Sequence, residues 1–372
     1  MMDSDQKNWR ASLLKQRESE VRERLKERSL DALLVSSVIN RFYLTLWQGD
    51  VESGFVLVTP EKNFVITDSR YTEHVSKGTA GFEVVETSEG IGPTLVDLFG
   101  KNRLKRVGYE SHDLSVFSYQ RIKKFTKGAK LVPVAHLIED IRAVKGDDEI
   151  SKLKKSSDIA AKTFNHIFNF IKPGVTEVEI AWQMEKYMRQ AGAEKMAWEP
   201  FIVAAGLNSS MPHYGAGNTK VKKGDMVQLD YGCSWQGYKC DISRVVFVGT
   251  PSEEQARIYN LVLEAQNLGL SLVKDGKSCA AIDLGVRKFL EKKTPHFYRH
   301  SLGHGVGLEV HELPHVNARR KSRLEAGNVI TIEPGIYIPR WGGVRIEDTL
   351  LVTKTGCQVL TKAPKKIGEV TI

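Results

Sequence analysis

Two segments of the chain place carboxylates at the same offset from a glycine. In GDMVQLDYGCSWQGYKCDISRVVFV, Asp230 stands six residues after a glycine, and Asp241 follows a turn region. In GNVITIEPGIYIPRWGGVRIEDTLLV, Glu333 stands six residues after a glycine, and Glu347 follows a Gly-Gly turn. Apolar and polar residues alternate in both segments, which predicts strands paired as hairpins. Four carboxylates in a half-buried sheet would repel one another and resist ionisation, so we expect a bound cation.

The stretch between the two segments, HSLGHGVGLEVHELP, supplies His300, His304 and His311. One or more of these imidazoles could lie beside the acids, on a glycine-rich strand that lets backbones approach closely. One histidine with four carboxylates is richer in oxygen than the Cys/His sets of structural zinc, and suits Mn²⁺ or Co²⁺ at least as well. The alternative is a pair of hairpins with ordinary surface acids, but such acids have no reason to repeat one offset from a glycine.

The order of the candidate ligands, with HSLGHGVGLEVHE, TIEPGIY and GGVRIED around them, resembles the pita-bread metallopeptidases. Within that family it is similar to the Xaa-Pro aminopeptidases and Xaa-Pro dipeptidases (prolidases) and not to the methionine aminopeptidases. The resemblance runs from about Asp148 to the C-terminus, and more loosely over the N-terminal third. It implies a C-terminal α+β pita-bread (creatinase/aminopeptidase) fold with an internal pseudo-two-fold, preceded by a smaller α/β creatinase-type domain.

The resemblance also implies a ligand set for two divalent ions per chain, with Mn²⁺ as the first expectation and Co²⁺ or Zn²⁺ as alternatives. Asp241 and Glu347 would bridge the ions, Asp230 would bind one, and His304 and Glu333 the other. A hydroxide held between the ions would attack the peptide carbonyl, and Glu333 would carry a proton to the leaving nitrogen.

Four further residues match family positions beside the metals. His213 follows AAGLNSSMP in a loop where the family carries a substrate-facing histidine, although spacing alone would suit a surface histidine. His300 and His311 match histidines that contact substrate and developing charge. Arg345 precedes Glu347 by two residues and so shares its strand face; it matches an arginine that supports the metal site, and a plain cross-strand salt bridge is the alternative.

The sequence also predicts some of the helices and strands that must position these residues. The domain boundary is expected between residues 144 and 145, giving an N-terminal α/β domain (1–144) and a catalytic domain (145–372). In the first domain we expect an amphipathic helix and three early strands, over residues 9–28, 31–36, 54–59 and 63–67.

In the second domain a helix is expected from Asp147, with acids in its first turn where the helix dipole favours them. Thr176 with Glu179, and Ser252 with Gln255, predict capping boxes for two more helices. Helices flanking paired strands, twice over, indicate the same α+β fold with an approximate internal repeat.

Composition excludes several classes. The 372 residues carry a net charge of +9, but Lys and Arg are dispersed among Asp and Glu, so no nucleic-acid groove is expected. The four cysteines form no regular spacing and are expected as free thiols; Cys240, next to a candidate ligand, could be a thiolate ligand, but strand alternation favours a packing role. The polar start of the chain and the absence of a long apolar run predict a cytoplasmic protein without a membrane segment.

Substrate choice is the most open point. We expect cleavage before proline, and the segment Thr67–Tyr71 (TDSRY) resembles one common in aminopeptidase members. No motif supplies a cation for the C-terminal carboxylate of a dipeptide, so the prediction is an Xaa-Pro aminopeptidase whose first domain, or a partner in a homodimer, closes one end of the cleft. An Xaa-Pro dipeptidase is the alternative. A non-catalytic pita-bread binding protein and a metal-free creatinase-like enzyme are disfavoured, because all five ligand positions are present.

Overall fold

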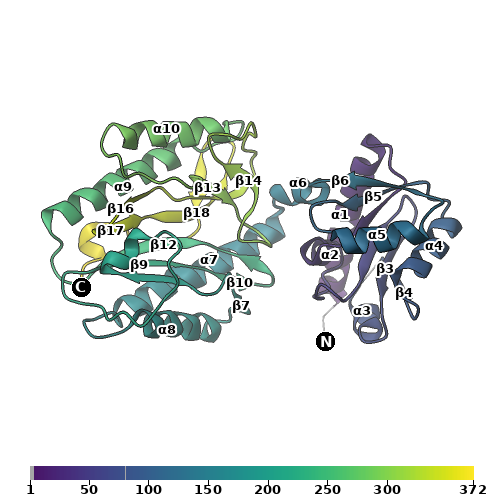
Figure 1. Cartoon of the computed structure of the whole chain (residues 1–372), viewed down its shortest axis with the longest axis horizontal. Helices are drawn as coiled ribbons and strands as arrows, with labels where there is room; N and C mark the ends of the chain where they lie inside the picture. The colour runs from purple at the N-terminus through teal and green to yellow at the C-terminus, as the bar shows by residue number, and fades with distance from the viewer. Residues whose placement is uncertain (1–3, 80) are drawn as a thin grey trace. The chain divides into compact units, whose positions relative to one another are not determined.

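The computed structural model describes residues 4–79 and 81–372. The chain forms two compact units, Met1–Ile141 and Arg142–Ile372, which are described separately (Figure 1). The boundary at residues 144 and 145 and the role assigned to the first domain stay predictions. No described helix combines the length and the apolar character needed to cross a membrane.

The first unit is built on a six-stranded mixed sheet in the order β4-β3-β2-β1-β5-β6. Strands β1, β5 and β6 run parallel, whereas β2 is antiparallel to both of its neighbours. The strands are β1 (Ala32–Val35), β2 (Phe55–Val58), β3 (Asn63–Thr67), β4 (Glu83–Glu86), β5 (Arg106–Glu110) and β6 (Lys130–Val134). The predicted early strands are therefore present, each within a residue or two of its expected bounds.

Helices α1 to α6 precede, connect or follow these strands in the chain. They are α1 (Ser4–Glu27), α2 (Val38–Thr45), α3 (Thr72–Gly78), α4 (Ile91–Lys101), α5 (Val116–Phe125) and α6 (Leu137–Ala143). Leu34, Leu57 and Phe64 on one sheet face share a buried apolar cluster with Leu95 of α4 and Ile122 of α5. The first helix starts before the expected residue 9, because the polar residues that precede its apolar stripe also take helical conformation.

The second unit contains an eight-stranded sheet in the order β14-β13-β15-β18-β12-β9-β8, with β19 paired to β18. Its strands are β8 (Ile202–Ala205), β9 (Met226–Tyr231), β12 (Ile242–Phe247), β13 (Gly303–Gly305), β14 (Glu312–Val316), β15 (Val329–Ile332), β18 (Glu347–Val352) and β19 (Cys357–Val359). Shorter strands are β7 (Lys195–Met196), β10 (Cys233–Trp235), β11 (Tyr238–Lys239), β16 (Gly335–Ile338) and β17 (Gly342–Arg345), with 3₁₀ turns at Gly206–Ser210 and Ile367–Glu369.

Two pairs of helices lie along this sheet, α7 and α8 with its first half and α9 and α10 with its second (Figure 1). They are α7 (Asp147–Phe168), α8 (Glu177–Gln190), α9 (Glu253–Leu272) and α10 (Cys279–Glu291). Both predicted capping boxes are present: the Thr176 hydroxyl accepts from the Glu179 amide at 3.3 Å, and Ser252 does the same for Gln255 at 3.2 Å. The repeat of hairpin and helix pair gives the pita-bread architecture its pseudo-two-fold.

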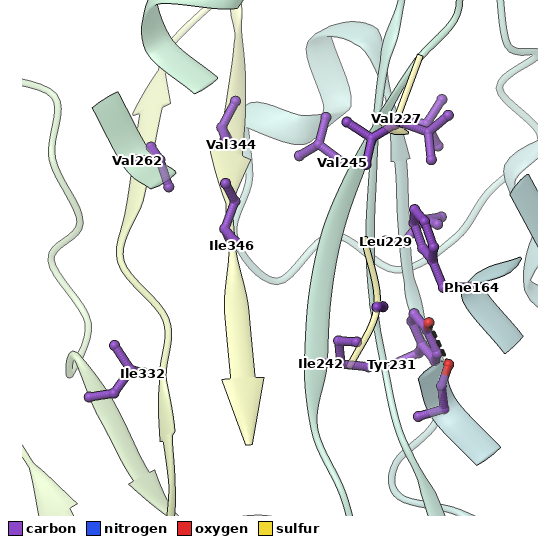
Figure 2. Close-up of a cluster of buried hydrophobic side chains, with 14 of the residues drawn as sticks. Phe164, Val227, Leu229, Tyr231, Ile242, Val245, Val262, Ile332, Val344 and Ile346 are labelled. Atoms are coloured by element: carbon purple, nitrogen blue, oxygen red, sulfur yellow. Dashed lines mark hydrogen bonds between the residues drawn. The ribbon is translucent and has the colours of Figure 1, made fainter. Parts of the chain in front are cut away.

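The core of the second unit fixes the strands that carry the acids. Figure 2 shows Phe164 of α7 beside Leu229 of β9, and Tyr231 with its hydroxyl donating to the Ala160 carbonyl at 2.9 Å. Val262 of α9 belongs to the same buried core cluster as Ile346, the residue that stands between β17 and β18 in the chain (Figure 2). Fully burying such side chains stabilises the fold by about 1.5–3 kcal/mol each. One face of each hairpin is thereby anchored, so the polar face of the strands is fixed in turn.

Candidate metal centre

The acids from the two hairpins meet because β12 pairs with β9 on one side and with β18 on the other. Ser243 of β12 lies opposite Asp230 in one ladder and opposite Glu347 in the other. Asp241 immediately precedes β12, and Glu333 immediately follows β15. The sheet therefore brings together four carboxylates, of which the first, Asp230, and the last, Glu347, are separated by more than a hundred residues.

His304 completes the cluster from β13. Its Nε2 lies 3.6 Å from Asp241 Oδ2 and 3.4 Å from Glu333 Oε1. Its Nδ1 lies 3.1 Å from the Gly305 carbonyl, to which it can only donate, so Nε2 presents a lone pair to the acids. Ligand atoms of Asp241, His304 and Glu347 all lie within 4.8 Å of one another. The hydrogen bond from Nδ1 of His304 to the Gly305 carbonyl is of the kind that usually orients metal-binding histidines.

Without a cation the cluster is electrostatically unfavourable. Burial, reinforced by the charge of Glu347, raises the pKa of Asp241 well above its ordinary value, and burial also raises the pKa of Glu333. Burial, with Asp230 adding repulsion, raises the pKa of Glu347 to about 8. Burial lowers the pKa of His304 to about 3, so this imidazole is neutral at physiological pH. A divalent ion binds a neutral imidazole and deprotonated carboxylates, and its positive charge would offset the repulsion among these acids.

Carboxylate oxygens without a hydrogen-bond partner are a second reason why these residues fit a metal site. Among the described residues, buried oxygens without a hydrogen-bond partner include Asp230 Oδ1, Asp241 Oδ1 and Glu347 Oε1. A buried carboxylate oxygen without a partner is costly, and such groups are rare in folded proteins. Bound cations would account for three of them in one cluster, and a set of mostly oxygen donors suits Mn²⁺ or Co²⁺.

Arg345 holds the far side of the cluster. Its guanidinium pairs with Asp230 Oδ2 and donates to Ser243 Oγ at 2.9 Å, and Ser243 Oγ donates in turn to Glu347 Oε2 at 2.9 Å. Burial opposes its charge, but Tyr337 and Asp230 outweigh burial and raise the pKa of Arg345. The cross-strand salt bridge is therefore present and leaves the other oxygen of Asp230 available, while the supporting role of Arg345 at a metal site stays a prediction.

His300 is held by its own set of contacts. Its Nδ1 lies 2.8 Å from the Ser301 carbonyl and 3.8 Å from Glu333 Oε2, and its Nε2 lies 3.1 Å from the Tyr337 hydroxyl. Arg345 donates to that hydroxyl at 2.7 Å. Burial lowers the pKa of His300 to about 4. A neutral His300 is therefore tied to the metal cluster through Tyr337 and Arg345.

A cavity of about 450 Å³ opens onto these groups. Its lining contains all of the predicted site residues, together with others from neighbouring loops: Trp198, Ile202, Pro212, His213, Asp230, Asp241, His300, Ser301, His304, Val310, His311, His315, Glu333, Arg345 and Glu347. The His311 ring lies 4.3 Å from the His304 ring, centroid to centroid. His213 and His311 reach one space although they lie far apart in sequence, which suits a site that holds a peptide.

Tyr337, Ser243 and His315 take part in the site but were not singled out from the sequence. Tyr337 stands within TIEPGIY, so its motif was visible, but its role depends on contacts with His300 and Arg345 that only the fold creates. Ser243 looks like any strand residue until both ladders are known.

The side chain of Cys240 makes its hydrogen bonds with backbone groups of Ser156 and Cys233. Its thiol is buried and lies 3.2 Å from the Ser156 carbonyl, and its sulfur lies beside the Cys233 amide at 3.5 Å. All four cysteines are free thiols. These contacts agree with a packing role for Cys240.

Comparison with known proteins gives the family. The metallopeptidase family M24 model matches residues 151–354, and the creatinase/prolidase N-terminal domain model matches residues 17–144. An Xaa-Pro dipeptidase of Pyrococcus horikoshii is 34% identical over 364 residues, covering 95% of this chain and 99% of that protein. The structure of an Xaa-Pro dipeptidase from Bacillus anthracis matches with a TM-score of 0.92 at 37% identity, covering 96% of this chain and 100% of that one. That of an X-Pro aminopeptidase from Thermotoga maritima matches with a TM-score of 0.85 at 34% identity, covering 92% and 98%. The chain belongs to metallopeptidase family M24.

Proposed function

We propose that this member of metallopeptidase family M24 is an Xaa-Pro dipeptidase (prolidase), which hydrolyses the bond before proline in a dipeptide. The carrying observation is the likeness, over nearly the whole chain and both units, to proteins named Xaa-Pro dipeptidases. The sequence alone favoured an Xaa-Pro aminopeptidase, and the relatives support the alternative better than that main prediction.

Two divalent ions are proposed as the cofactors, with Mn²⁺ as the first candidate and Co²⁺ or Zn²⁺ as alternatives. Asp241 and Glu347 would be shared between the two positions, with Asp230 on one and His304 and Glu333 on the other. Four carboxylates and a neutral imidazole balance the charge of two divalent ions, whereas a single ion would leave a buried net negative charge. When bound, the ions supply Lewis acidity and a nucleophile at neutral pH.

The chain's own residues would handle the proton and the substrate. The nitrogen of an Xaa-Pro bond belongs to a tertiary amide with no N–H, so it leaves as a secondary amine and needs a proton. Glu333 stands at the cavity beside His304, and burial raises the pKa of its carboxyl, so it is suited to take up that proton and deliver it to the proline nitrogen.

The remaining histidines would position the peptide. His213 and His311 line the cavity and can donate to the substrate carbonyl as negative charge develops there. Nδ1 of His300 contacts the Ser301 carbonyl and Nε2 contacts the Tyr337 hydroxyl. Because both ring nitrogens are engaged, His300 would act by holding its neighbours in place. Arg345 is the only Arg or Lys among the described cavity-lining residues, and it is paired with Asp230. A dipeptide's carboxylate would therefore depend on imidazole donors.

An Xaa-Pro aminopeptidase is the second candidate, because the Thermotoga maritima X-Pro aminopeptidase shares the fold at a similar identity. The discriminating test supplies Mn²⁺ and Co²⁺ separately to metal-free enzyme and compares hydrolysis of Ala-Pro with that of Ala-Pro-Ala. Faster cleavage of the dipeptide is expected. Preference for the tripeptide would favour the aminopeptidase instead, and hydrolysis of neither substrate with either ion would favour a binding role.

A homodimer remains a proposal that rests on the family resemblance, and a cytoplasmic location remains one that rests on the four free cysteines. Light scattering of the full-length protein would measure the mass of the assembly directly.

A further inference from the structure

A second cluster of metal-type donors lies in the first unit, outside the M24-matched part of the chain. His112 follows β5, His136 follows β6, and Glu139 stands in the first turn of α6. Strands β5 and β6 are adjacent and parallel, so the loops at their carboxyl ends meet at one edge of the sheet. Ligand-binding groups often gather at that edge in sheets of this kind.

The three side chains already converge. His112 Nε2 lies 3.0 Å from Glu139 Oε1, and the rings of His112 and His136 are stacked with centroids 4.9 Å apart. One ligand atom from each residue can be chosen so that all lie within 4.8 Å of one another. A tetrahedral ion with bonds of about 2.1 Å needs ligand atoms separated by about 3.4 Å. Rotation of the two partly exposed rings could close that difference without movement of the backbone.

A second observation points to a ligand. Glu139 Oε2 is buried and has no hydrogen-bond partner among the described residues, although Glu139 Oε1 contacts both His112 and Asn40. A simple His112–Glu139 ion pair would explain Oε1 but would leave Oε2 unsatisfied. His136 has a φ of 56°, a left-handed conformation that is uncommon outside glycine and brings its ring beside His112.

Hydrogen bonds from neighbouring residues hold Glu139 in place. Asn40 Nδ2 donates to Glu139 Oε1 at 2.5 Å and to Glu110 Oε1 at 2.6 Å. Glu110 Oε2 accepts from the amides of Ser36 and Ser37, both at 2.7 Å, after β1. This network orients Glu139 in the way that outer-shell hydrogen bonds orient metal-binding carboxylates.

We propose that His112, His136 and Glu139 form a metal site in the first unit that binds a borderline divalent ion such as Zn²⁺. Two imidazoles and one carboxylate, with a position left open to water, suit Zn²⁺ better than the oxygen-rich centre of the second unit does. The ion would join the loops after β5 and β6 to the start of α6, and would so stabilise the carboxyl edge of the sheet.

The test counts ions on the full-length protein. Wild type, the double variant His112→Ala/His136→Ala and the control His74→Ala are dialysed against Mn²⁺ and graded free Zn²⁺, and total Mn²⁺ plus Zn²⁺ per chain is measured by mass spectrometry. His74 is exposed on α3 and has no part in the cluster. The double variant is expected to hold one ion fewer than wild type, and His74→Ala the same number. Equal totals in the double variant and wild type would overturn the proposal.

Two further readouts separate this site from the catalytic one. Zn²⁺ should raise the melting temperature of Mn²⁺-loaded wild type, and this rise should be lost in Glu139→Gln as in the double variant. Hydrolysis of Xaa-Pro substrate by the Mn²⁺-loaded double variant should equal that of wild type. A missing ion accompanied by lost hydrolysis would place the effect at the catalytic centre and refute the assignment.

Discussion

Several side chains of the candidate metal centre are each held by a neighbouring group that fixes their direction. The Gly305 carbonyl directs Nε2 of His304 toward the acids, and Arg345 occupies one oxygen of Asp230 while leaving the other available. Tyr337 links Arg345 to His300. In contrast, His213 is exposed and reaches the cavity from a loop, which makes it the best residue for separating substrate contacts from metal binding.

His213→Ala is expected to retain the metal content of wild type but to lower turnover by roughly 10²-fold or more, the scale of a lost transition-state donor. Metal content is measured by mass spectrometry and turnover on Xaa-Pro dipeptides. His296→Ala is the control, since His296 is an exposed histidine of the same unit outside the cavity lining. Metal loss in His213→Ala would mean that His304 is not the only imidazole ligand.

Strand β13 positions its histidine by close backbone contact on both sides. A Cβ added at Gly303 would lie 1.9 Å from the Thr331 carbonyl oxygen, and one at Gly305 would lie 2.1 Å from that of Leu313. His304 stands between the two glycines, paired with β14 and β15. Only residues without a side chain allow the three strands to approach this closely, so the glycines set the depth at which the imidazole enters the cluster.

Gly303→Ala should therefore push β13 away from β15 and withdraw His304 from the acids. We expect weaker metal retention on dialysis, and a loss of about 1–3 kcal/mol in the free energy of unfolding. Gly356→Ala is the matched control, because a Cβ there would meet no atom within 4 Å. A folded Gly303→Ala protein with wild-type metal content would contradict this account of β13.

At the scale of the whole molecule, the arrangement of acids that we propose binds metal is expected to destabilise the metal-free fold. The sheet buries four carboxylates from two hairpins in one place, and Glu347 titrates at about 8 when folded but near 4.5 when unfolded. The folded chain therefore binds more protons than the unfolded chain between these values. The contribution of Glu347 to the free energy of unfolding is fully present below pH 4.5 and is lost as the pH rises toward 8.

The metal-free chain is thus expected to lose stability between pH 6.5 and pH 8, by about 2 kcal/mol from Glu347 alone. His300 and His304, whose pKa values fall from 6.5 to about 4 and 3, act in the opposite sense, but only below pH 6.5. Denaturant unfolding of metal-free protein at the two pH values measures the change.

Two controls frame that measurement. Glu347→Gln should show a shallower dependence on pH, since it removes the titrating group. Added Mn²⁺ should reverse the trend in wild type, because ions compete with protons for the same oxygens. Metal-free wild type that becomes more stable from pH 6.5 to pH 8 would contradict the burial of these acids as a like-charged cluster.

The sequence by itself determined the features that depend on local interactions. Strand alternation around Asp230 and Glu333, and the capping boxes at Thr176 and Ser252, follow from contacts between residues near one another in the chain, so their positions were predictable. The family motifs added the architecture and the metallopeptidase class, which the comparisons confirm, and an order of metal ligands that stays a prediction.

Only the tertiary structure decided which distant residues meet. Ser243 serves both hairpins because β12 lies between β9 and β18, and His112 meets His136 because β5 and β6 are neighbours. Sheet order depends on long-range packing that no local pattern encodes. The motifs favoured an aminopeptidase, whereas the relatives support a dipeptidase better, and the motifs did not separate the two for the same reason. The motifs surround the candidate metal ligands, which aminopeptidases and dipeptidases share. Selection for substrate length depends instead on side chains from remote loops at the ends of the cleft.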